Sequence, residues 1–382
     1  MISCGEASGD LYAGALALEL RRLDPGLRLF GMGGERLQAA GADLVADYRG
    51  ISVTGLLEVV RLLPRTYALY RRLVAEARAR RPDVAVLVDF PDFNFRLGRA
   101  LRALGVPVVY YVAPQLWAWR PGRLRAMREF VDRVLVIFPF ERALYEQAGV
   151  PVEFVGHPLT DLARAGSTRA AFLGELGLDV EAPTFALLPG SRANEVGAIL
   201  PGLAAAAGRI AQALPAAQFV LARASGLDDR LFAPLDEACR EAGLRLGRTE
   251  GRTDEVLASA DVALTASGTA TVQAALHECP MVIVYRLSPL TYRLGIRFVK
   301  VDTYGMVNLV AGRRIVPELI QDAFTPGSVA DETARYFEDA AHAARTRAAL
   351  ADVRARLGDA GASRRAAEQV LAVCENRRRG LS

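Results

Sequence analysis

Three short segments of the chain combine glycine with hydroxyl or cationic side chains just ahead of a predicted helix. They are GEASGD (5–10), LPGSRANEV (188–196) and TASGTATVQAAL (265–276). Such turns leave backbone N–H groups free at a helix N-terminus, where these groups and the helix dipole favour an anion. The second segment adds Arg192, whose delocalised charge suits a leaving diphosphate. The alternative for this segment is an ordinary capped helix with Arg192 in solvent.

Two of these turns fall in the second half of the chain, which makes them more informative together than either is alone. Residues 267–269 follow a predicted strand and open the next helix, as Ser191 and Arg192 do. A nucleoside diphosphate needs several hydrogen-bond donors, and this half supplies them without a metal. The turn at 5–10 is a weaker signal, because Ser8 or Asp10 can equally be a plain N-cap.

A carboxylate stands at the end of a predicted strand in the first half. VDFPDFN (88–94) places Asp89 there, and Asp92 follows three residues later. A carboxylate in such a place can accept a proton from an attacking hydroxyl, which typically gives about 10²–10⁴-fold in rate. Spacing alone does not choose between Asp89 and Asp92, and the alternative is that Asp89 only orders the loop through backbone hydrogen bonds.

Two further segments pair apolar side chains with arginine. PQLWAWR (114–120) places Trp117 and Trp119 beside Arg120, either as packing under the loop or as an aromatic wall for an acceptor sugar. Residues 51–73 carry many leucines and valines followed by arginines, a combination that suits a membrane surface. Periodicity alone favours a core helix for this second segment.

Short apolar strands alternating with helix-like stretches position these segments. Strands are predicted at 84–89, 106–112, 133–137, 184–188, 218–222, 261–265 and 280–285. The alternation indicates parallel sheets covered by helices, in which ligands bind at the carboxyl ends of the strands. A polar stretch at 156–168 predicts the connection between two domains. Because only four residues precede Gly5, we expect a very short first strand unless the true start lies upstream.

The composition fits a two-domain α/β protein, with 382 residues, 52% of them hydrophobic and 24% charged. The four cysteines and three histidines are scattered, and no Asp-x-Asp triplet occurs. We therefore expect no metal, no cofactor and no disulfide. No apolar run of about 18 residues and no signal-peptide pattern is present, so membrane contact is expected to be peripheral. A nucleic-acid partner is not expected.

Together these segments resemble the lipid-A-disaccharide synthases, over essentially the whole chain. The matching pieces, in family order, are GEASGD, 55–63, VDFPDFN, YYVAPQLWAWR, FPFE, FVGHPL, LPGSR, SGTAT, PMVIVYR, NLVAGR and VPELIQ. The resemblance implies an α/β glycosyltransferase-B fold, with two Rossmann-like domains facing across a cleft. It implies an acceptor and membrane-facing domain at 1–165, a UDP-sugar donor domain at 166–345, and a helical segment at 346–382 that packs back on the first domain.

The resemblance also implies a reaction. UDP-2,3-diacylglucosamine is the expected donor and 2,3-diacylglucosamine 1-phosphate (lipid X) the expected acceptor, joined with inversion into a β-1,6-linked disaccharide as UDP leaves. The expected place is the cytoplasmic face of the inner membrane, with peripheral attachment. A long C-terminal crossover is compatible with exchange between two copies, and so with a homodimer. The alternatives are an enzyme like UDP-N-acetylglucosamine 2-epimerase and a non-catalytic lipid- or nucleotide-binding protein.

Carried over residue by residue, the resemblance implies that Asp89 is the base. The residues expected to bind the donor and its UDP are Glu6, Ser8, Gly9, Gly190, Ser191, Arg192, Glu195, Ser267, Gly268, Thr269, Gln273, Tyr285 and Asn308. Those expected to face the acceptor or the membrane are Leu56, Leu57, Val59, Val60, Leu63, Trp117 and Arg120. The family often has Glu where Gln273 stands, a position that in related folds contacts the ribose.

Overall fold

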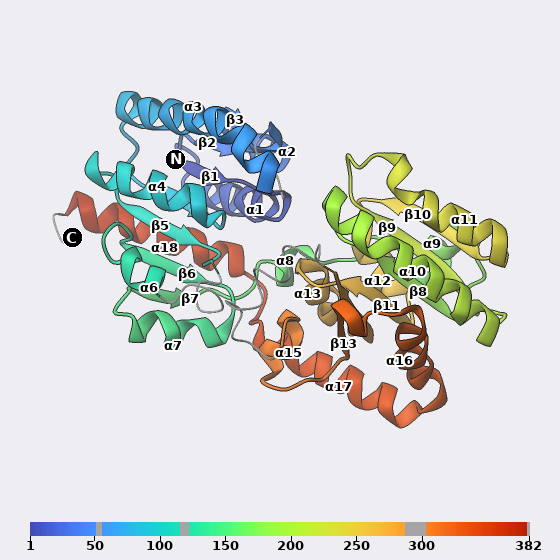
Figure 1. Ribbon diagram of the computed structural model, residues 1–382. Helices are drawn as coiled ribbons and strands as arrows, with labels where there is room; N and C mark the ends of the chain where they lie inside the picture. Colours follow the sequence, from blue (N-terminus) through green and yellow to red (C-terminus); the bar gives the residue numbers. More distant parts are fainter. Residues whose placement is uncertain (51–55, 115–121, 287–302, 380–382) are drawn as a thin grey trace. The chain divides into compact units, whose positions relative to one another are not determined.

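The computed structural model describes residues 1–50, 56–114, 122–286 and 303–379, without the side chains of 50, 56–62, 122, 123 and 378. The chain divides into two compact units, each with its own parallel sheet (Figure 1). Unit 1 comprises Met1–Asp161 and Leu357–Ser382, and unit 2 comprises Leu162–Arg356. The expected boundary at 345/346 is therefore displaced, because it would cut through the continuous helix α17 (Ala340–Arg356). The boundary expected at 165/166 lies four residues further along the chain than the one observed.

Unit 1 is built on seven parallel strands in the order β3-β2-β1-β4-β5-β6-β7. They are β1 (Ile2–Cys4), β2 (Phe30–Gly33), β3 (Asp43–Asp47), β4 (Ala85–Val88), β5 (Val108–Tyr111), β6 (Arg133–Val136) and β7 (Val152–Phe154). The first strand is as short as expected, yet it pairs with both β2 and β4 near the middle of the sheet. The strand order reverses between β1 and β4, and ligands of doubly wound sheets bind at the carboxyl ends beside that point.

Helices cover both faces of this sheet (Figure 1). They are α1 (Ala7–Leu23), α2 (Glu35–Ala39), α3 (Leu56–Arg80), α4 (Pro91–Ala103), α6 (Gly122–Met127), α7 (Pro139–Gln147) and α18 (Ala362–Arg378). Leu73 of α3 and Phe95 of α4 pack with Leu87 and Tyr110 of the sheet in one core. On the other face α18 packs against α1, so the last helix returns to the first unit, as the resemblance implied.

Unit 2 repeats the plan with six parallel strands in the order β10-β9-β8-β11-β12-β13. They are β8 (Thr184–Leu188), β9 (Gln218–Arg223), β10 (Arg245–Glu250), β11 (Val262–Ala266), β12 (Met281–Tyr285) and β13 (Glu318–Ile320). The order reverses between β8 and β11. The two glycine turns of this half, which follow these two strands, thus share one edge of the sheet.

The helices of unit 2 are α9 (Arg169–Glu175), α10 (Ala193–Ala213), α11 (Ala233–Ala242), α12 (Thr253–Ser259), α13 (Thr269–Leu276), α15 (Met306–Ala311), α16 (Pro326–Glu338) and α17, and α8 (Leu159–Leu162) lies at the junction of the units. Among the described residues, α10 is the one helix long and apolar enough to span a membrane. Its residues Ile199, Leu203 and Ala207 are fully buried in the core, so α10 packs as the central helix of this unit.

Candidate functional site

The turn after β4 holds Asp89 in a conformation that non-glycine residues rarely adopt. Asp89 and Phe90 have φ angles of 44° and 49°, in the left-handed region. Such residues cost on the order of 1–3 kcal/mol each and persist where the surroundings hold them. Here Tyr110 Oη donates to the Asp89 carbonyl at 2.6 Å, and the Asp89 N–H donates to the Tyr111 carbonyl at 3.2 Å. The backbone of the half-buried Asp89 is therefore fixed from two sides.

Asn94 completes this clamp and was not singled out from the sequence. Its buried amide Nδ2 donates to the Asp89 carbonyl at 2.8 Å and to the Val88 carbonyl at 3.2 Å. Its Oδ1 accepts from the Ser3 hydroxyl at 3.0 Å, which ties the end of β4 to β1. The only available signal was the final Asn of VDFPDFN, because the partner Ser3 lies far away in sequence.

The first glycine turn touches the same place. A Cβ atom on Gly5 would stand 2.3 Å from the ring of Phe90, so the turn after β1 lies directly against the turn after β4. Glu6 and Ser8 follow in this turn and are partly exposed, whereas Gly9 packs α1 closely against Cys4. Gly9 thus serves helix–strand packing, whereas Glu6 and Ser8 are the two polar side chains of the turn that reach the surface.

Asp10 does not act as a plain N-cap of α1, as one interpretation of the turn had it. Its buried carboxylate reaches the start of α2, where it accepts from the backbone N–H groups of Gly34 at 2.7 Å, Arg36 at 3.0 Å and Leu37 at 3.2 Å. Asp10 therefore caps a neighbouring helix, and its negative charge is balanced by three backbone donors.

The two candidate carboxylates in VDFPDFN occupy different places. Asp92 is exposed in the first turn of α4. The helix dipole favours a negative charge at this position whether or not the residue takes part in catalysis. Asp89 lies in the clamped turn at the switch point of the sheet. The geometry thus separates a pair that spacing left undecided: the backbone of Asp89 is fixed at the carboxyl edge of the sheet, whereas Asp92 is exposed on a helix.

A second carboxylate, Glu141, shares the neighbour Tyr145 with Asp89. It is fully buried in the first turn of α7 and accepts from the Phe138 N–H at 3.4 Å. Tyr145, one turn later, donates its hydroxyl to the Pro114 carbonyl at 3.1 Å. Burial raises the pKa of Tyr145, and the carboxylates of Glu141 and Asp89 raise it further. The FPFE motif (138–141) by itself assigns no role to Glu141.

His157, from the FVGHPL segment, is a neutral core residue of unit 1. Its ring lies edge-on to Tyr12, with 5.9 Å between centroids, and 5.2 Å from the ring of Phe138. Nδ1 accepts from the Leu159 N–H at 3.2 Å, so the ring proton belongs on Nε2. Burial lowers the pKa of His157 to about 3, which keeps the ring uncharged at neutral pH.

In unit 2, the turn after β8 presents a paired arginine. Gly190 has a φ of 117°, and a Cβ there would stand 2.9 Å from Glu195, so only glycine fits. Arg192 precedes α10 and pairs with the buried carboxylate of Glu195 at 2.5 Å, which directs its guanidinium. Burial raises the pKa of Tyr285 at the end of β12, Glu195 raises it further and Arg192 lowers it, so Tyr285 lies beside this pair. Ser191 is exposed in the same turn.

The turn after β11 is the more open of the two. Gly268 has a φ of 150°, and a Cβ placed there would meet open space. The residue is the N-cap of α13, and among the described residues no side chain caps the first N–H groups of this helix. Ser267 donates its hydroxyl to the Tyr304 carbonyl at 3.3 Å, and Thr269 begins the helix.

Asn308, one of the residues expected to bind the donor, is buried within unit 2. It is 1% exposed, its Oδ1 accepts from the N–H groups of Ile315 and Val316, and its Nδ2 donates to the Val316 carbonyl and to Glu318 at 2.7 Å. Glu318 also accepts from the Tyr304 and Gly305 N–H groups. The amide of Asn308 is thus fully used inside the unit. It holds in place the segment beside Ser267.

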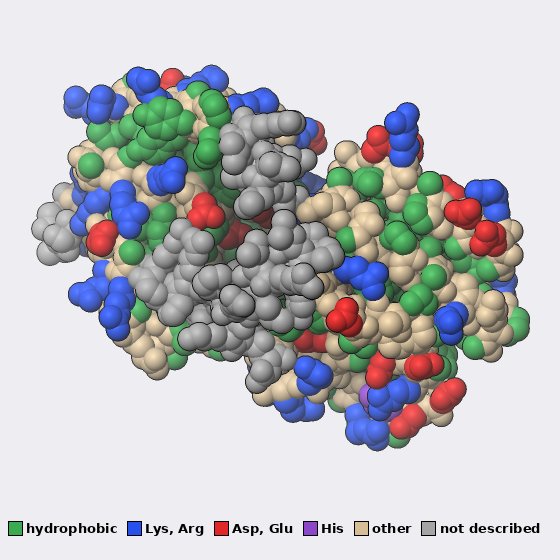
Figure 2. Space-filling view, in the orientation of Figure 1, with side chains coloured by type: hydrophobic (Ala, Val, Ile, Leu, Met, Phe, Trp, Pro, Cys, Tyr) green, Lys and Arg blue, Asp and Glu red, His purple; other side chains and the backbone are tan. Residues whose placement is uncertain are grey.

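Part of the expected acceptor surface lies outside the described residues, namely Trp117, Arg120 and the side chains of Leu56, Leu57, Val59 and Val60. The described part of α3 continues that surface. Leu63 and Tyr67 are 51% and 61% exposed. The ring of Tyr67 stacks with that of Tyr70, with 6.2 Å between the ring centroids. Figure 2 shows hydrophobic side chains gathered over α3 with cationic side chains near them.

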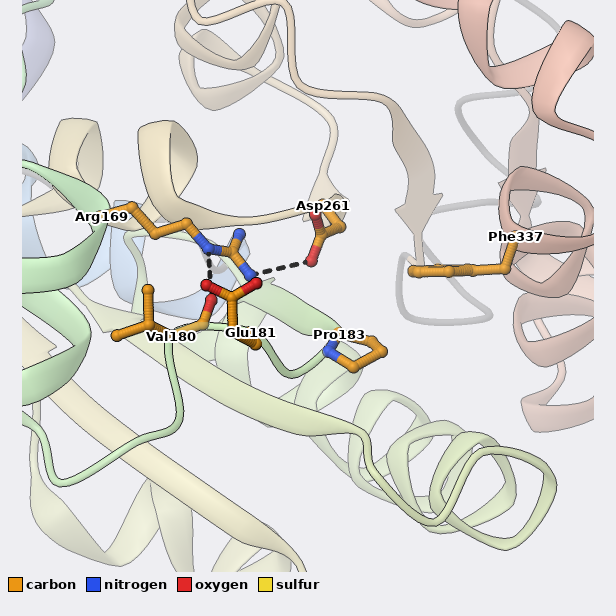
Figure 3. Close-up of a pocket in the computed structure, with 6 residues that line it drawn as sticks. All are labelled: Arg169, Val180, Glu181, Pro183, Asp261 and Phe337. Atoms are coloured by element: carbon orange, nitrogen blue, oxygen red, sulfur yellow. Dashed lines mark hydrogen bonds and ion pairs between the residues drawn. The ribbon is translucent and has the colours of Figure 1, made fainter.

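A shallow depression of about 460 Å³ in unit 2 lies away from these turns. Arg169, Glu181, Asp261 and Phe337 line it, at the amino ends of β8 and β11 (Figure 3). Arg169 donates there to the carbonyls of Val180, Ala182 and Ser259 and pairs with Asp261 at 3.3 Å. Arg169 thus joins the segments that precede β8 and β11 at the amino ends of these strands. Doubly wound folds bind their ligands at the opposite, carboxyl ends.

The fold and the two sets of turns define a protein of the two-Rossmann-domain class that includes UDP-sugar glycosyltransferases and epimerases. The UDP-N-acetylglucosamine 2-epimerase of Neisseria meningitidis, solved with UDP-GlcNAc, is similar with a TM-score of 0.67 at 13% identity over 96% of this chain and 98% of its own. Alr3699/HepE of Anabaena, solved with UDP and glucose, gives 0.60 at 16% identity over 97% and 98%. At these identities the likeness concerns the fold alone.

Sequence comparison identifies the family. The model described as lipid-A-disaccharide synthetase matches residues 1–373. The lipid-A-disaccharide synthase of Myxococcus xanthus is 44% identical over 97% of this chain and 96% of its own length, and that of Anaeromyxobacter dehalogenans strain 2CP-C is 46% identical over 98% and 97%. The chain belongs to the lipid-A-disaccharide synthetase family. The comparisons therefore do not favour the epimerase alternative, which has only the shared fold behind it.

Proposed function

We propose that the protein is an inverting glycosyltransferase that joins UDP-2,3-diacylglucosamine to lipid X and releases UDP. Membership of the family over residues 1–373 supports the reaction. The observation that carries the assignment of roles is the position of the candidate residues. Asp89 is fixed at the switch point of unit 1, and the Arg192–Glu195 pair and Gly268 stand at the switch point of unit 2.

We propose Asp89 as the general base. Its carboxylate takes the proton of the acceptor 6-hydroxyl while that oxygen forms a bond to the anomeric carbon of the donor. The bond from this carbon to the diphosphate oxygen breaks, and its electron pair leaves with UDP. Attack opposite to the leaving group inverts the configuration and gives the β-1,6 linkage. A rigid backbone at Asp89 serves this step, because proton transfer depends on a hydrogen-bond distance held in advance.

Unit 2 is proposed to hold the donor and its departing charge. Arg192, directed by Glu195, and the outward N–H groups at the start of α13 supply donors for the diphosphate. Preorganised donors of this kind stabilise charge that develops as the bond breaks, and removing one typically costs about 10²–10³-fold in rate. These groups replace the metal that many diphosphate sites use, so we propose a metal-independent reaction.

We further propose that α3 brings the enzyme to its lipid substrates. Leu63 and Tyr67 are exposed on this helix, and Arg65, Arg71 and Arg72 are exposed beside them. Exposed apolar residues with nearby cations bind the surface of anionic membranes, and tyrosine favours the boundary between water and lipid. The proposed location is the cytoplasmic face of the inner membrane, with peripheral attachment.

The test is to incubate the purified protein with both substrates in detergent and EDTA and to follow UDP and disaccharide together. We expect equal amounts of the two products, and neither without lipid X. UDP released without lipid X and without disaccharide would point to an epimerase-like reaction instead. No product from a protein shown to be folded and to bind UDP would overturn the proposed substrates.

A further inference from the structure

One face of α13 extends away from the turn that is proposed to bind the diphosphate. Thr269, Gln273 and His277 are four residues apart along the chain, so they lie above one another on this face, about 6 Å apart along the axis. All three are only partly buried, whereas Val272, Ala274 and Ala275 of the same segment are buried. A nucleoside diphosphate bound at the helix start and laid along this face would bring its ribose next to Gln273.

Asp254, from the first turn of α12, contacts this face. Its Oδ1 accepts from Gln273 Nε2 at 3.2 Å and lies 2.9 Å from His277 Nε2. The side chains of Asp254 and His277 are 20% and 11% exposed, so the group is largely shielded from water. Gln273 of α13 and His277, the residue that follows this helix, thus contact one oxygen of one carboxylate.

This contact decides which way the Gln273 amide points. A carboxylate only accepts hydrogen bonds, so the amide nitrogen must face Asp254 and the carbonyl Oε1 must point away. Within the part of the chain that the structure describes, Oε1 accepts no hydrogen bond from another residue. An outward amide carbonyl is a suitable acceptor for a hydroxyl group.

We propose that Asp254 is a positioning residue for nucleotide recognition, which turns the Gln273 carbonyl outward to accept a hydrogen bond from a ribose hydroxyl. This inference rests on the proposed binding of a UDP-sugar by unit 2. His277 holds the Asp254 carboxylate in place from the other side. The arrangement has a specific consequence: a glutamine needs a partner to orient it, whereas a glutamate does not, because both of its oxygens accept.

The alternative is that Asp254 only joins α12 to α13. Its place in the first turn of α12 is favourable for any acidic residue, and its bonds link two helices that also pack together. A purely structural role predicts that loss of Asp254 weakens the binding of every nucleotide by the same factor. A positioning role predicts that it removes the preference for nucleotides that carry the ribose hydroxyls.

The experiment compares the binding of UDP, 2′-deoxy-UDP and 3′-deoxy-UDP by calorimetry. We expect the wild type to prefer UDP to one of the deoxy analogues by about five- to tenfold, as for one hydrogen bond. Asp254→Ala and Gln273→Ala should each bring this ratio close to one. Asp254→Asn is the matched control, since its carbonyl oxygen can still accept from Gln273 and His277, and it should keep most of the preference.

A compensating variant keeps the test decisive even if Asp254→Ala is less stable. Asp254→Ala combined with Gln273→Glu should regain the preference, because a carboxylate needs no orienting partner. Gln273→Glu alone should bind UDP more weakly than the wild type, because it places two carboxylates about 3.2 Å apart. An unchanged ratio in Asp254→Ala would overturn the positioning role, while a wild type that binds no UDP would overturn the proposed function as well.

Discussion

The first six strands of unit 1 and the six strands of unit 2 follow the same order in their sheets. The turns at the carboxyl ends of the strands are nevertheless built differently in the two units. In unit 1 side chains clamp the backbone: Asn94 and Tyr110 both donate to the Asp89 carbonyl, and Phe90 covers Gly5. In unit 2 the turns are formed by glycines with positive φ, and the space around Gly268 is open. Unit 1 thus fixes one carboxylate in a strained turn, whereas unit 2 leaves donors exposed. The first design suits proton transfer, and the second suits a ligand rich in negative charge.

Within unit 2, the largest expected effect concerns the exposed donors. Arg192→Ala should lower kcat by about 10²–10³-fold, because the guanidinium is proposed to stabilise the leaving diphosphate. Because the substitution also removes the cation beside the buried Glu195 carboxylate, the melting temperature should fall as well. Steady-state kinetics with both substrates measures the effect. Arg192→Lys keeps the charge but not the planar guanidinium, so its kcat should lie between those of the wild type and Arg192→Ala. A loss below about threefold in Arg192→Ala would remove Arg192 from this role.

The two buried asparagines test the comparison directly, because each holds together one of the two edges. Asn94→Ala and Asn308→Ala should both lower the free energy of unfolding by about 1–3 kcal/mol, since each leaves buried polar groups without a partner. We expect Asn94→Ala to lower kcat, because the Asp89 turn loses a donor. Asn308→Ala should instead raise KM for the UDP-sugar. If both variants changed the same kinetic constant, the proposed separate roles of the two units, proton transfer in unit 1 and donor binding in unit 2, would be contradicted.

The smallest expected effect is a difference in acid sensitivity. Burial lowers the pKa of His157 to about 3, below its value of about 6.5 in an unfolded chain. Above pH 6.5 the ring is neutral in both states; below it the unfolded state takes up a proton and the folded state does not. Stability should therefore fall by about 1.4 kcal/mol per pH unit from about pH 6.5 downward, or about 2 kcal/mol by pH 5.

His157→Gln is the matched variant for this effect, because a glutamine carbonyl can also accept from the Leu159 N–H. Its unfolding free energy should depend less on pH over the same interval. Hydrogen exchange at pH 7 and pH 5 can follow the two units separately, and the additional opening in the wild type should appear in unit 1. Parallel pH profiles of the wild type and the variant would contradict the assignment.

The strands show where sequence reasoning succeeds and where it fails. The predicted strands correspond to β4, β5, β6, β8, β9, β11 and β12, which have long apolar runs because parallel strands inside a sheet are buried on both faces. Five strands were not predicted. Four of them, β3, β7, β10 and β13, are the edges of the two sheets, and the fifth, β2, lies inside the first sheet. Edge strands are half exposed, so segments such as RLGRTE (245–250) lack that pattern.

The candidate site was predictable only as far as local patterns reach. Asp89, Arg192 and Ser267 could be predicted because each lies in a turn that follows a parallel strand. In such sheets these turns lie at the carboxyl ends of the strands, where ligands bind. The partners Asn94 and Asp254 were missed, since their roles depend on contacts between segments distant in sequence. Asn308 was identified by motif, but only its buried hydrogen bonds show that it supports the site from inside.

The most direct test of the account compares Asp89→Asn with Asp92→Asn in a single-turnover assay with both substrates. The two substitutions are identical in chemistry and lie three residues apart, on a clamped turn and on an exposed helix start. We predict that Asp89→Asn lowers the rate by about 10²–10⁴-fold, while UDP affinity and melting temperature stay near those of the wild type. Asp92→Asn should remain within about threefold of the wild type. A nearly active Asp89→Asn, or a large loss in Asp92→Asn, would contradict the central claim that the clamped carboxylate is the base.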